Sequence, residues 1–253
     1  MGVEPVPDVP AAVADGGDER LLLVADFHAG IEWELRRDGV ELASQAESRR
    51  DRLLGLVGET GPDRLVVLGD LGHKIGQSKG VEREELTDLF AALDVPVTVA
   101  KGNHDGDVEE LVPEVDADVT ITPTDGARIG DVGVVHGHTW PSEDVLSAAV
   151  VCVGHEHPVV RLEDEVGGRR VERVWLRGEL DPITFEAHYD WDLDEAPAID
   201  GALVVFPAFN DLSSGTWVNV EGQEFLSPFL PEGLTGGEAY MLDGTRLGPY
   251  DLV

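Results

Sequence analysis

Short, continuously apolar segments recur along the first part of the chain, and each ends at a polar residue or a glycine. Five of them follow one another: Leu21–Ala25, Leu65–Leu68, Val97–Ala100, Val132–Val135 and Val150–Val153. A strand that is covered on both faces has this composition, because neither face alternates with solvent. We therefore predict five buried β-strands.

Two amphipathic segments separate some of these strands. Gln45–Val57 and Glu82–Leu93 each carry large apolar residues on one helical face and charged residues on the opposite face. Strands that alternate with helices of this length indicate an α/β layered fold. Ligands in such folds bind at the carboxyl ends of the strands, so the polar residues that follow each strand are candidates for chemistry.

The regions outside this α/β pattern differ from it in composition and in the elements that they predict. Residues 1–19 are rich in Pro, Asp, Gly and Ala, and they predict a flexible acidic tail before a single domain over residues 20–253. Within residues 158–200, two apolar segments flank a Gly-Gly pair and predict a β-hairpin, which an acidic loop follows. Leu203–Phe206 predicts a further strand.

The chain is strongly acidic. Its 253 residues include 51 Asp and Glu but only 18 Lys and Arg, which gives a formal net charge of −33. Three of the cationic residues are lysines, namely Lys74, Lys79 and Lys101. Self-repulsion should destabilise such a chain at low salt, whereas at molar salt the Debye length falls to about 3 Å. We therefore predict a protein from a halophile.

The same composition disfavours several classes of partner and location. No basic stripe can form, so tight nonspecific binding to a nucleic-acid backbone and attraction to an anionic membrane are not expected. The apolar segments are far shorter than the roughly 20 residues that span a bilayer. The acidic N-terminus does not resemble a secretory signal, and the single cysteine, Cys152, cannot form an internal disulfide. These features predict a cytoplasmic protein.

Histidines gather at the predicted strand ends. Seven of the eight lie in five short windows: Asp26-Phe27-His28, Gly69-Asp70-Leu71-Gly72-His73, Gly102-Asn103-His104-Asp105, His136-Gly137-His138 and Gly154-His155-Glu156-His157. Imidazole, carboxylate and amide donors without a thiolate suit Mn, Fe or Zn. There are more donors than one ion requires, so the sequence predicts two divalent ions, an arrangement that serves phosphoryl displacement.

These windows resemble the five blocks of the calcineurin-like metallophosphoesterase superfamily, which are DxH, GD, GNH[DE], H and GHxH. All five occur here in order. The chain is most similar to the ICC-like branch, which includes the DNA-ligase-associated phosphoesterases. That similarity rests on Gly69-Asp70-Leu71 followed by His73, on Gly154-His155-Glu156-His157-Pro158 and on Pro207-Ala208-Phe209-Asn210. The resemblance implies a four-layer α/β/β/α sandwich with two mixed β-sheets.

The resemblance also implies a role for each block residue. It assigns seven metal ligands: Asp26, His28 and His157 to one ion, Asn103, His136 and His155 to the other, and Asp70 to both. Mn is the favoured metal, with Fe or Zn as alternatives. His104 would contact the phosphate and protonate the leaving group, and Asp105 would orient the ring of His104.

Four further residues have roles that the sequence leaves open. Many superfamily members carry an acidic residue where this chain has His73. That histidine would either support a ligand or lie at the surface, or else contact the phosphate or act as an extra donor at the pocket edge. His138 would be a neighbour of His136 or a ligand in its place, and the first histidine is preferred. Lys101 is a candidate contact for substrate phosphate. Asn210 would either approach the site or form a turn.

The resulting functional hypothesis is a dinuclear-metal-dependent phosphoesterase in which a metal-bridging hydroxide attacks phosphorus. A phosphodiester or nucleotide-type substrate is favoured by analogy with the branch. One alternative is a DNA nuclease or repair-associated phosphoesterase that acts on polymeric nucleic acid, for which the hairpin offers Arg169, Arg170, Arg173 and Arg177. Another is a non-catalytic binding module, which the intact donor set disfavours. The sequence predicts no particular oligomeric state.

Overall fold

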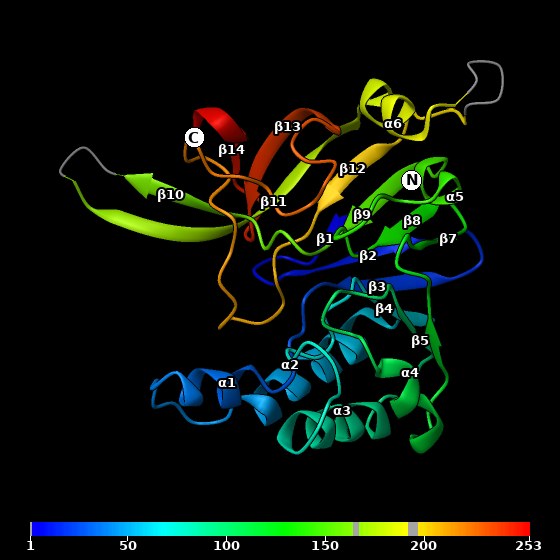
Figure 1. Ribbon diagram of the computed structural model, residues 1–253, viewed down its shortest axis with the longest axis vertical. Coiled ribbons are helices and arrows are strands. Elements are labelled where there is room, and N and C mark those ends of the chain that lie inside the picture. The colour runs from blue at the N-terminus through cyan, green and yellow to red at the C-terminus, as the bar shows by residue number, and fades with distance from the viewer. Residues whose placement is uncertain (1, 164–166, 192–196) are drawn as a thin grey trace.

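Two β-sheets pack face to face, and helices cover both outer faces (Figure 1). The computed structural model describes residues 2–163, 167–191 and 197–253. The sheets contain parallel and antiparallel strands, so each is mixed. The predicted four-layer α/β/β/α fold is therefore confirmed.

The first sheet has six strands in sequential order. They are β1 (Glu4–Pro5), β2 (Ala11–Asp15), β3 (Arg20–Val24), β4 (Arg64–Val67), β5 (Val97–Val99) and β6 (Val119–Ile121). Strands β3 to β6 are parallel, whereas β1 and β2 are antiparallel to their neighbours. The helices on this side are α1 (Ile31–Arg37), α2 (Ala46–Thr60), α3 (Val81–Ala91) and α4 (Val108–Leu111), with a 3-10 turn at Val112–Glu114.

The prediction of a flexible tail over residues 1–19 is wrong for the part that the structure describes. Strand β2 pairs with β3 along its whole length, from Ala11 opposite Val24 to Asp15 opposite Arg20. The side chains of Ala11 and Ala12 are fully buried. Alanine is uncommon in strands, so the composition of this segment did not indicate a strand. The segment becomes one because the edge of β3 offers unpaired backbone groups for it to bond.

The second sheet lies above the first in Figure 1. Its strands, in spatial order, are β14 (Arg246–Pro249), β13 (Leu234–Met241), β11 (Arg169–Leu180), β12 (Ala202–Val205), β9 (Val150–Val153), β8 (Val132–Val135) and β7 (Ala127–Ile129), and β10 (Val159–Glu163) pairs with β11. Strands β12, β9 and β8 are parallel. The outer layer contains α5 (Glu143–Leu146) and α6 (Pro182–Tyr189), and a 3-10 turn at Tyr250–Leu252 ends the chain.

Three apolar layers hold the sandwich together. On β3, Leu21 and Leu23 pack between the two sheets, while Leu22 and Val24 pack against the helices. Residues of β8 and β9 divide in the same way between the central layer and the layer beneath α5 and α6. Because both faces of these strands are buried, their sequences are continuously apolar, as predicted.

The segment 158–200 contains the hairpin that the Gly-Gly pair indicated. Strand β10 pairs antiparallel with β11 from Val159 opposite Arg173 to Glu163 opposite Arg169, and the hairpin extends beyond the body of the protein (Figure 1). Part of the predicted acidic loop, residues 192–196, lies outside the described residues. Among the residues described, no helix is both long and apolar enough to cross a membrane.

Candidate metal centre

The polar segments that follow β3 and β4 run side by side. The backbone N–H of His28 donates to the carbonyl oxygen of Asp70 at 2.9 Å, and that of Ala29 donates to Leu71 at 2.9 Å. The strand ends of the second sheet meet the same place, because the N–H of His155 donates to the Asp26 carboxylate at 3.2 Å. Parallel strands from both sheets thus deliver their polar residues to one site.

The backbone at this site is strained. Of the seven described non-glycine residues with positive φ, five are predicted metal ligands: Asp26 (57°), His28 (49°), Asp70 (48°), His155 (68°) and His157 (44°). L-residues rarely adopt this left-handed conformation, and it persists where surrounding structure imposes it, commonly at functional sites. The positive φ angles therefore indicate that the fold holds these five residues in a conformation that aims their side chains at the site.

Two block glycines make room for the ligand side chains. A Cβ atom at Gly69 would overlap the ring of His136, and one at Gly102 would overlap the carboxylate of Asp70. Gly69 also has a φ of 76°, in the region that glycine adopts most easily. These positions are glycine because the ligands pack directly against the backbone.

One group of donors consists of Asp26, His28 and His157. Their ligand atoms lie within 4.8 Å of one another. Nε2 of His157 is 3.1 Å from Oδ1 of Asp26 and 3.3 Å from Nε2 of His28. These are the three residues that the family resemblance assigns to one ion.

A second group contains Asp70, His136 and His155, again within 4.8 Å. Nε2 of His136 lies 3.4 Å from Oδ1 of Asp70 and 3.1 Å from Oδ1 of Asn103, so the amide joins this group. Asp70 also reaches the first group, because its Oδ2 is 3.9 Å from Nε2 of His28. The seven predicted ligands therefore meet in two adjacent groups with Asp70 between them.

The hydrogen bonds of two histidines test whether a cation fits. Nδ1 of His136 donates to the carbonyl oxygen of Leu68 at 2.9 Å, and Nδ1 of His157 donates to that of Ser214 at 2.7 Å. In the neutral ring, Nε2 of each then presents a lone pair. These lone pairs face further acceptors, namely the oxygens of Asn103 and Asp26. Acceptors that converge without donors are what a divalent cation requires.

The electrostatics lead to the same conclusion. Burial lowers the pKa of His136, but the carboxylates of Asp70 and Asp26 outweigh it and raise that pKa to about 9. The two carboxylates therefore demand a positive charge between them, which a proton supplies when no metal does. Burial lowers the pKa of His28 to about 3 and that of His155 to about 4, so both are neutral ligands near pH 7.

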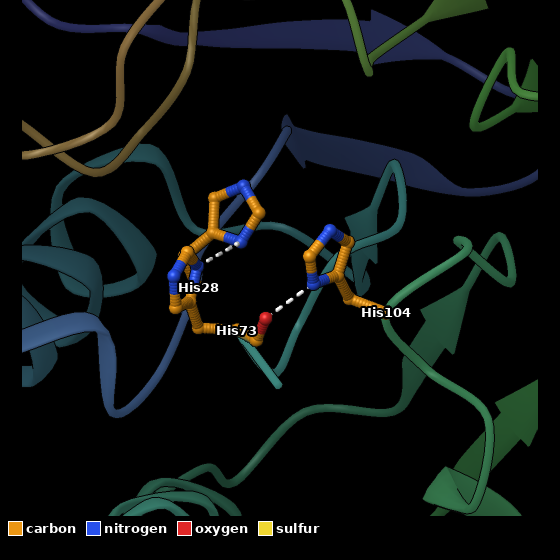
Figure 2. A group of neighbouring side chains, drawn as sticks. All are labelled: His28, His73 and His104. Atoms are coloured by element: carbon orange, nitrogen blue, oxygen red, sulfur yellow. Dashed lines mark hydrogen bonds between the residues drawn. The ribbon is translucent and has the colours of Figure 1, made fainter. Parts of the chain in front are cut away.

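His104 lies beside His28 and His73 (Figure 2), and its side chain is more exposed than that of Asp70, at 21% against 4%. Its Nε2 lies 3.9 Å from Oδ2 of Asp70, and its Nδ1 hydrogen-bonds to the backbone carbonyl of His73. The ring of His73 stacks beside that of His104, with centroids 5.6 Å apart. Nδ1 of His73 is 3.3 Å from Nδ1 of His28, so His73 accepts a hydrogen bond from this ligand when Nε2 of His28 binds metal.

The structure does not give Asp105 the role that the resemblance implied. Its buried carboxylate accepts hydrogen bonds from the N–H groups of Leu71 at 2.8 Å and Gly102 at 2.9 Å. The expected contact with the ring of His104 is therefore wrong, since the carbonyl of His73 takes that place. Burial, together with the nearby charge of Asp70, raises the pKa of Asp105 to about 6. Asp105 instead ties two ligand-bearing loops together.

Asn210 combines both roles that the sequence left open. Its Nδ2 donates to the carbonyl oxygens of Phe27 at 2.9 Å and His28 at 3.2 Å. Its Oδ1 accepts from the N–H of Leu212 at 2.9 Å, which forms a local turn. The side chain is buried, with 1% of its surface exposed. Asn210 therefore holds the backbone of the first ligand block.

The two remaining candidates lie at the margin of the site. The half-buried ring of His138 packs 5.3 Å from that of His136, and it belongs to neither donor group. The ammonium group of Lys101 pairs with the carboxylate of Glu109. His136, and not His138, therefore lies among the donors. Lys101, the candidate phosphate contact, is bound to an acidic side chain.

Sequence reasoning missed two sets of supporting residues. Glu156, between two candidate ligands, is fully buried and accepts hydrogen bonds from the N–H groups of Ser227 at 2.6 Å and Leu226 at 3.1 Å. Beneath the first block, Arg49 is buried between Glu32 and Glu85. The signal for Glu156 was its place inside the GHxH block, whereas the Arg49 network has no local signature.

Comparison with known proteins agrees with this geometry. A family model described as calcineurin-like phosphoesterase matches residues 19–207. The crystal structure of Pseudomonas putida nuclease MPE is similar over 97% of this chain and 100% of that chain, with 19% identity and a TM-score of 0.55. Yfce, a phosphoesterase from E. coli, aligns over 57% of this chain and 73% of that chain, with 20% identity and a TM-score of 0.31. No curated protein matches the chain significantly.

These similarities differ in what they show. At 19% identity the nuclease shows a shared fold, and the TM-score of the E. coli protein is too low to add an argument. The family match covers most of the chain and includes all five ligand blocks. The chain therefore belongs to the calcineurin-like phosphoesterase family and is a metal-dependent phosphoester hydrolase.

Proposed function

We propose that the chain is a dinuclear-metal-dependent phosphoesterase that prefers phosphodiester or nucleotide-type substrates. The observation that carries the dinuclear proposal is the position of Asp70, whose two oxygens face His136 at 3.4 Å and His28 at 3.9 Å in separate donor groups. Manganese is the favoured metal, because the donors are imidazoles, carboxylates and an amide without a thiolate. Iron and zinc remain alternatives for the same donor set.

In this proposal, the side chains of the protein hold the metal ions and the substrate in place and donate a proton to the leaving group. When bound, divalent cations lower the pKa of water and neutralise charge on the phosphate. His104 is the proposed general acid, since its ring is partly exposed and its Nε2 lies 3.9 Å from Oδ2 of Asp70, beside both donor groups. The carbonyl of His73 fixes Nδ1 of this ring, so Nε2 is free to protonate the departing oxygen.

A comparison of three substrates tests the proposal. In molar salt with Mn²⁺, we expect turnover of the diester bis-p-nitrophenyl phosphate to exceed turnover of the monoester p-nitrophenyl phosphate. A chelator should abolish both activities. Lack of turnover of either ester and of single-stranded DNA, with metal bound, would instead support a binding module that keeps the fold without catalysis.

A nuclease acting on polymeric nucleic acid is the second candidate. It is favoured by the fold that the chain shares with the P. putida nuclease over 97% of its length. The hairpin arginines do not add a continuous positive surface, because Arg173 pairs with Asp211 at 2.8 Å and Arg177 donates to the carbonyl of Val3. Degradation of single-stranded DNA at rates above those of small diesters would favour this candidate.

We also propose that the protein works in a salt-rich cytoplasm. The net charge of −33 and the unpaired, buried Cys152 support this setting. Thermal unfolding in a series of KCl concentrations is the test. The unfolding temperature should rise steadily from about 0.1 M to about 3 M KCl, as the Debye length shrinks. A temperature that does not depend on salt would contradict the halophilic assignment.

A further inference from the structure

A cavity of about 270 Å³ adjoins the metal centre, between α1 and the start of α3. Its lining includes an indole, two ammonium groups and two carboxylates, contributed by Trp33, Lys74, Lys79, Glu34 and Glu82. None of these residues belongs to the donor groups described above. The cavity is therefore distinct from the two donor groups and could hold a different part of a ligand.

The wall of the cavity is continuous with the ligand-bearing loops. Gly30, which lines the cavity, follows His28 by two residues, and Lys74 directly follows His73. The two segments are joined by hydrogen bonds, including one of 3.1 Å from the N–H of His73 to the carbonyl of Ala29. A molecule bound at the metal centre would therefore have this cavity as a neighbour.

The cavity is held in shape by close packing. A Cβ atom at Gly30 would lie 2.7 Å from Cβ of Glu82, so the first turn of α3 presses directly on the loop. The N–H of Lys74 donates to Glu82 at 3.1 Å, and the N–H of Gly30 donates to Glu85 at 2.8 Å. These contacts indicate a preformed site.

Trp33 gives the cavity a surface for stacking. Its side chain is 47% exposed, although contact between a large aromatic side chain and water is unfavourable. The guanidinium carbon of Arg37 lies 5.0 Å from the ring centroid and steadies the indole. Aromatic side chains in this setting are the platforms on which nucleobases stack.

The lysines make the cavity unusual within this chain. Lys101 pairs with Glu109, but neither Lys74 nor Lys79 lies within 4.0 Å of a carboxylate in the described part of the chain. Two lysines and two glutamates line the cavity, so its charge is roughly balanced in a protein of net charge −33. An anionic ligand meets less repulsion here than over most of the surface.

We propose that this cavity binds one nucleotide of a single-stranded nucleic acid, next to the phosphate that is cleaved. Trp33 stacks on the nucleobase, and Lys74 and Lys79 face the phosphate of that nucleotide. This inference rests on the phosphodiesterase function proposed above. It adds the class of substrate and the residues that recognise it.

A pair of diesters with the same leaving group isolates the nucleobase. Thymidine 5′-(p-nitrophenyl phosphate) and methyl p-nitrophenyl phosphate both release p-nitrophenol, and they differ in whether a nucleoside is present. For the Mn²⁺-loaded protein in molar salt, Trp33→Ala should lower kcat/KM for the thymidine ester by about ten-fold, the scale of one base stack. It should leave the methyl ester within about two-fold, and Trp33→Phe should retain most of the preference. Ile183→Ala, at an apolar residue of α6 that is 73% exposed, should change neither.

The lysines are tested with oligothymidylate as the substrate. The double variant Lys74→Glu and Lys79→Glu should lower kcat/KM several-fold more than a charge-matched double variant outside the hairpin, Arg246→Glu and Arg128→Glu. Equal losses in the two double variants, or equal effects of Trp33→Ala on both small esters, would overturn the nucleotide site. Failure of the wild-type protein to hydrolyse either small ester with metal bound would instead overturn the proposed function itself.

Discussion

The backbone carbonyl of His73 accepts a hydrogen bond from Nδ1 of His104 (Figure 2). This contact joins the loop after Asp70 to the loop after β5, and it fixes the ring that is proposed to protonate the leaving group. The bond uses the backbone of His73, so the His73 side chain is left to face His28. The two histidines can therefore be tested separately.

Replacing His104 should impair chemistry and not metal binding. We expect His104→Ala to retain its metal content while turnover falls by about 10²- to 10⁴-fold, the usual size of general acid catalysis. The loss should be larger for a dinucleotide than for a p-nitrophenyl ester, since the poorer leaving group needs the proton more. His73→Ala keeps the carbonyl and should retain most turnover at saturating Mn²⁺. Loss of both ions from His104→Ala would show that the assigned role is wrong.

Replacing Asp70 should remove metal. Its oxygens lie between the two donor groups, so Asp70→Asn removes a charge that both use. We expect metal content, measured by elemental analysis, to fall below one ion per chain, with activity reduced at least about 100-fold. Asp131→Asn, at an exposed position in the turn between β7 and β8, is the control. Full metal content in Asp70→Asn would contradict a shared ligand.

Asn210 should matter for metal binding as well as for stability. Asn210→Ala leaves the carbonyl of Phe27 without its donor and that of His28 with only the N–H of Ile31 at 3.3 Å, which should cost about 1–3 kcal/mol of unfolding free energy. Asn219 is a matched control, because its amide clamps the backbone of Arg161 at 2.9 Å, away from the donor groups. Both alanine variants should unfold at lower denaturant, but Asn210→Ala alone should weaken Mn²⁺ affinity in a titration. Equal affinities in the two variants would remove the positioning role.

The Arg49 network should make stability depend on pH once the arginine is gone. Arg49→Met leaves Glu32 and Glu85 buried without a counter-charge, at a cost of about 3–5 kcal/mol near pH 8. Burial already raises the pKa of Glu85. In the variant, folded-state pKa values above the unfolded value of about 4.3 mean that stability is lost as pH rises.

The deficit should therefore be smaller at pH 5 than at pH 8 in urea unfolding experiments in molar salt. Arg50→Met, at an exposed ion pair with Asp88, should show little loss at either pH. A deficit in Arg49→Met that is the same at both pH values would indicate that lost packing, and not unpaired charge, is responsible.

The sequence by itself determined the layers of the fold and the identity of the residues that would meet. Strands such as Leu21–Ala25 are continuously apolar because both of their faces are buried, so a short stretch of sequence is enough to recognise them. The histidine and carboxylate blocks stand directly after those strands, so the parallel arrangement of the strands brings them to one edge.

Tertiary structure decided the contacts that no local pattern records. Strand β2 exists because β3 leaves an edge free, and Asp105 bonds to backbone N–H groups of loops that are brought together across the sheet. The burial of Arg49 and the cavity beside Trp33 likewise depend on partners distant in the chain. Periodicity reports whether a side chain is buried, but hydrogen-bond partners are chosen by whichever groups the folded chain leaves unsatisfied.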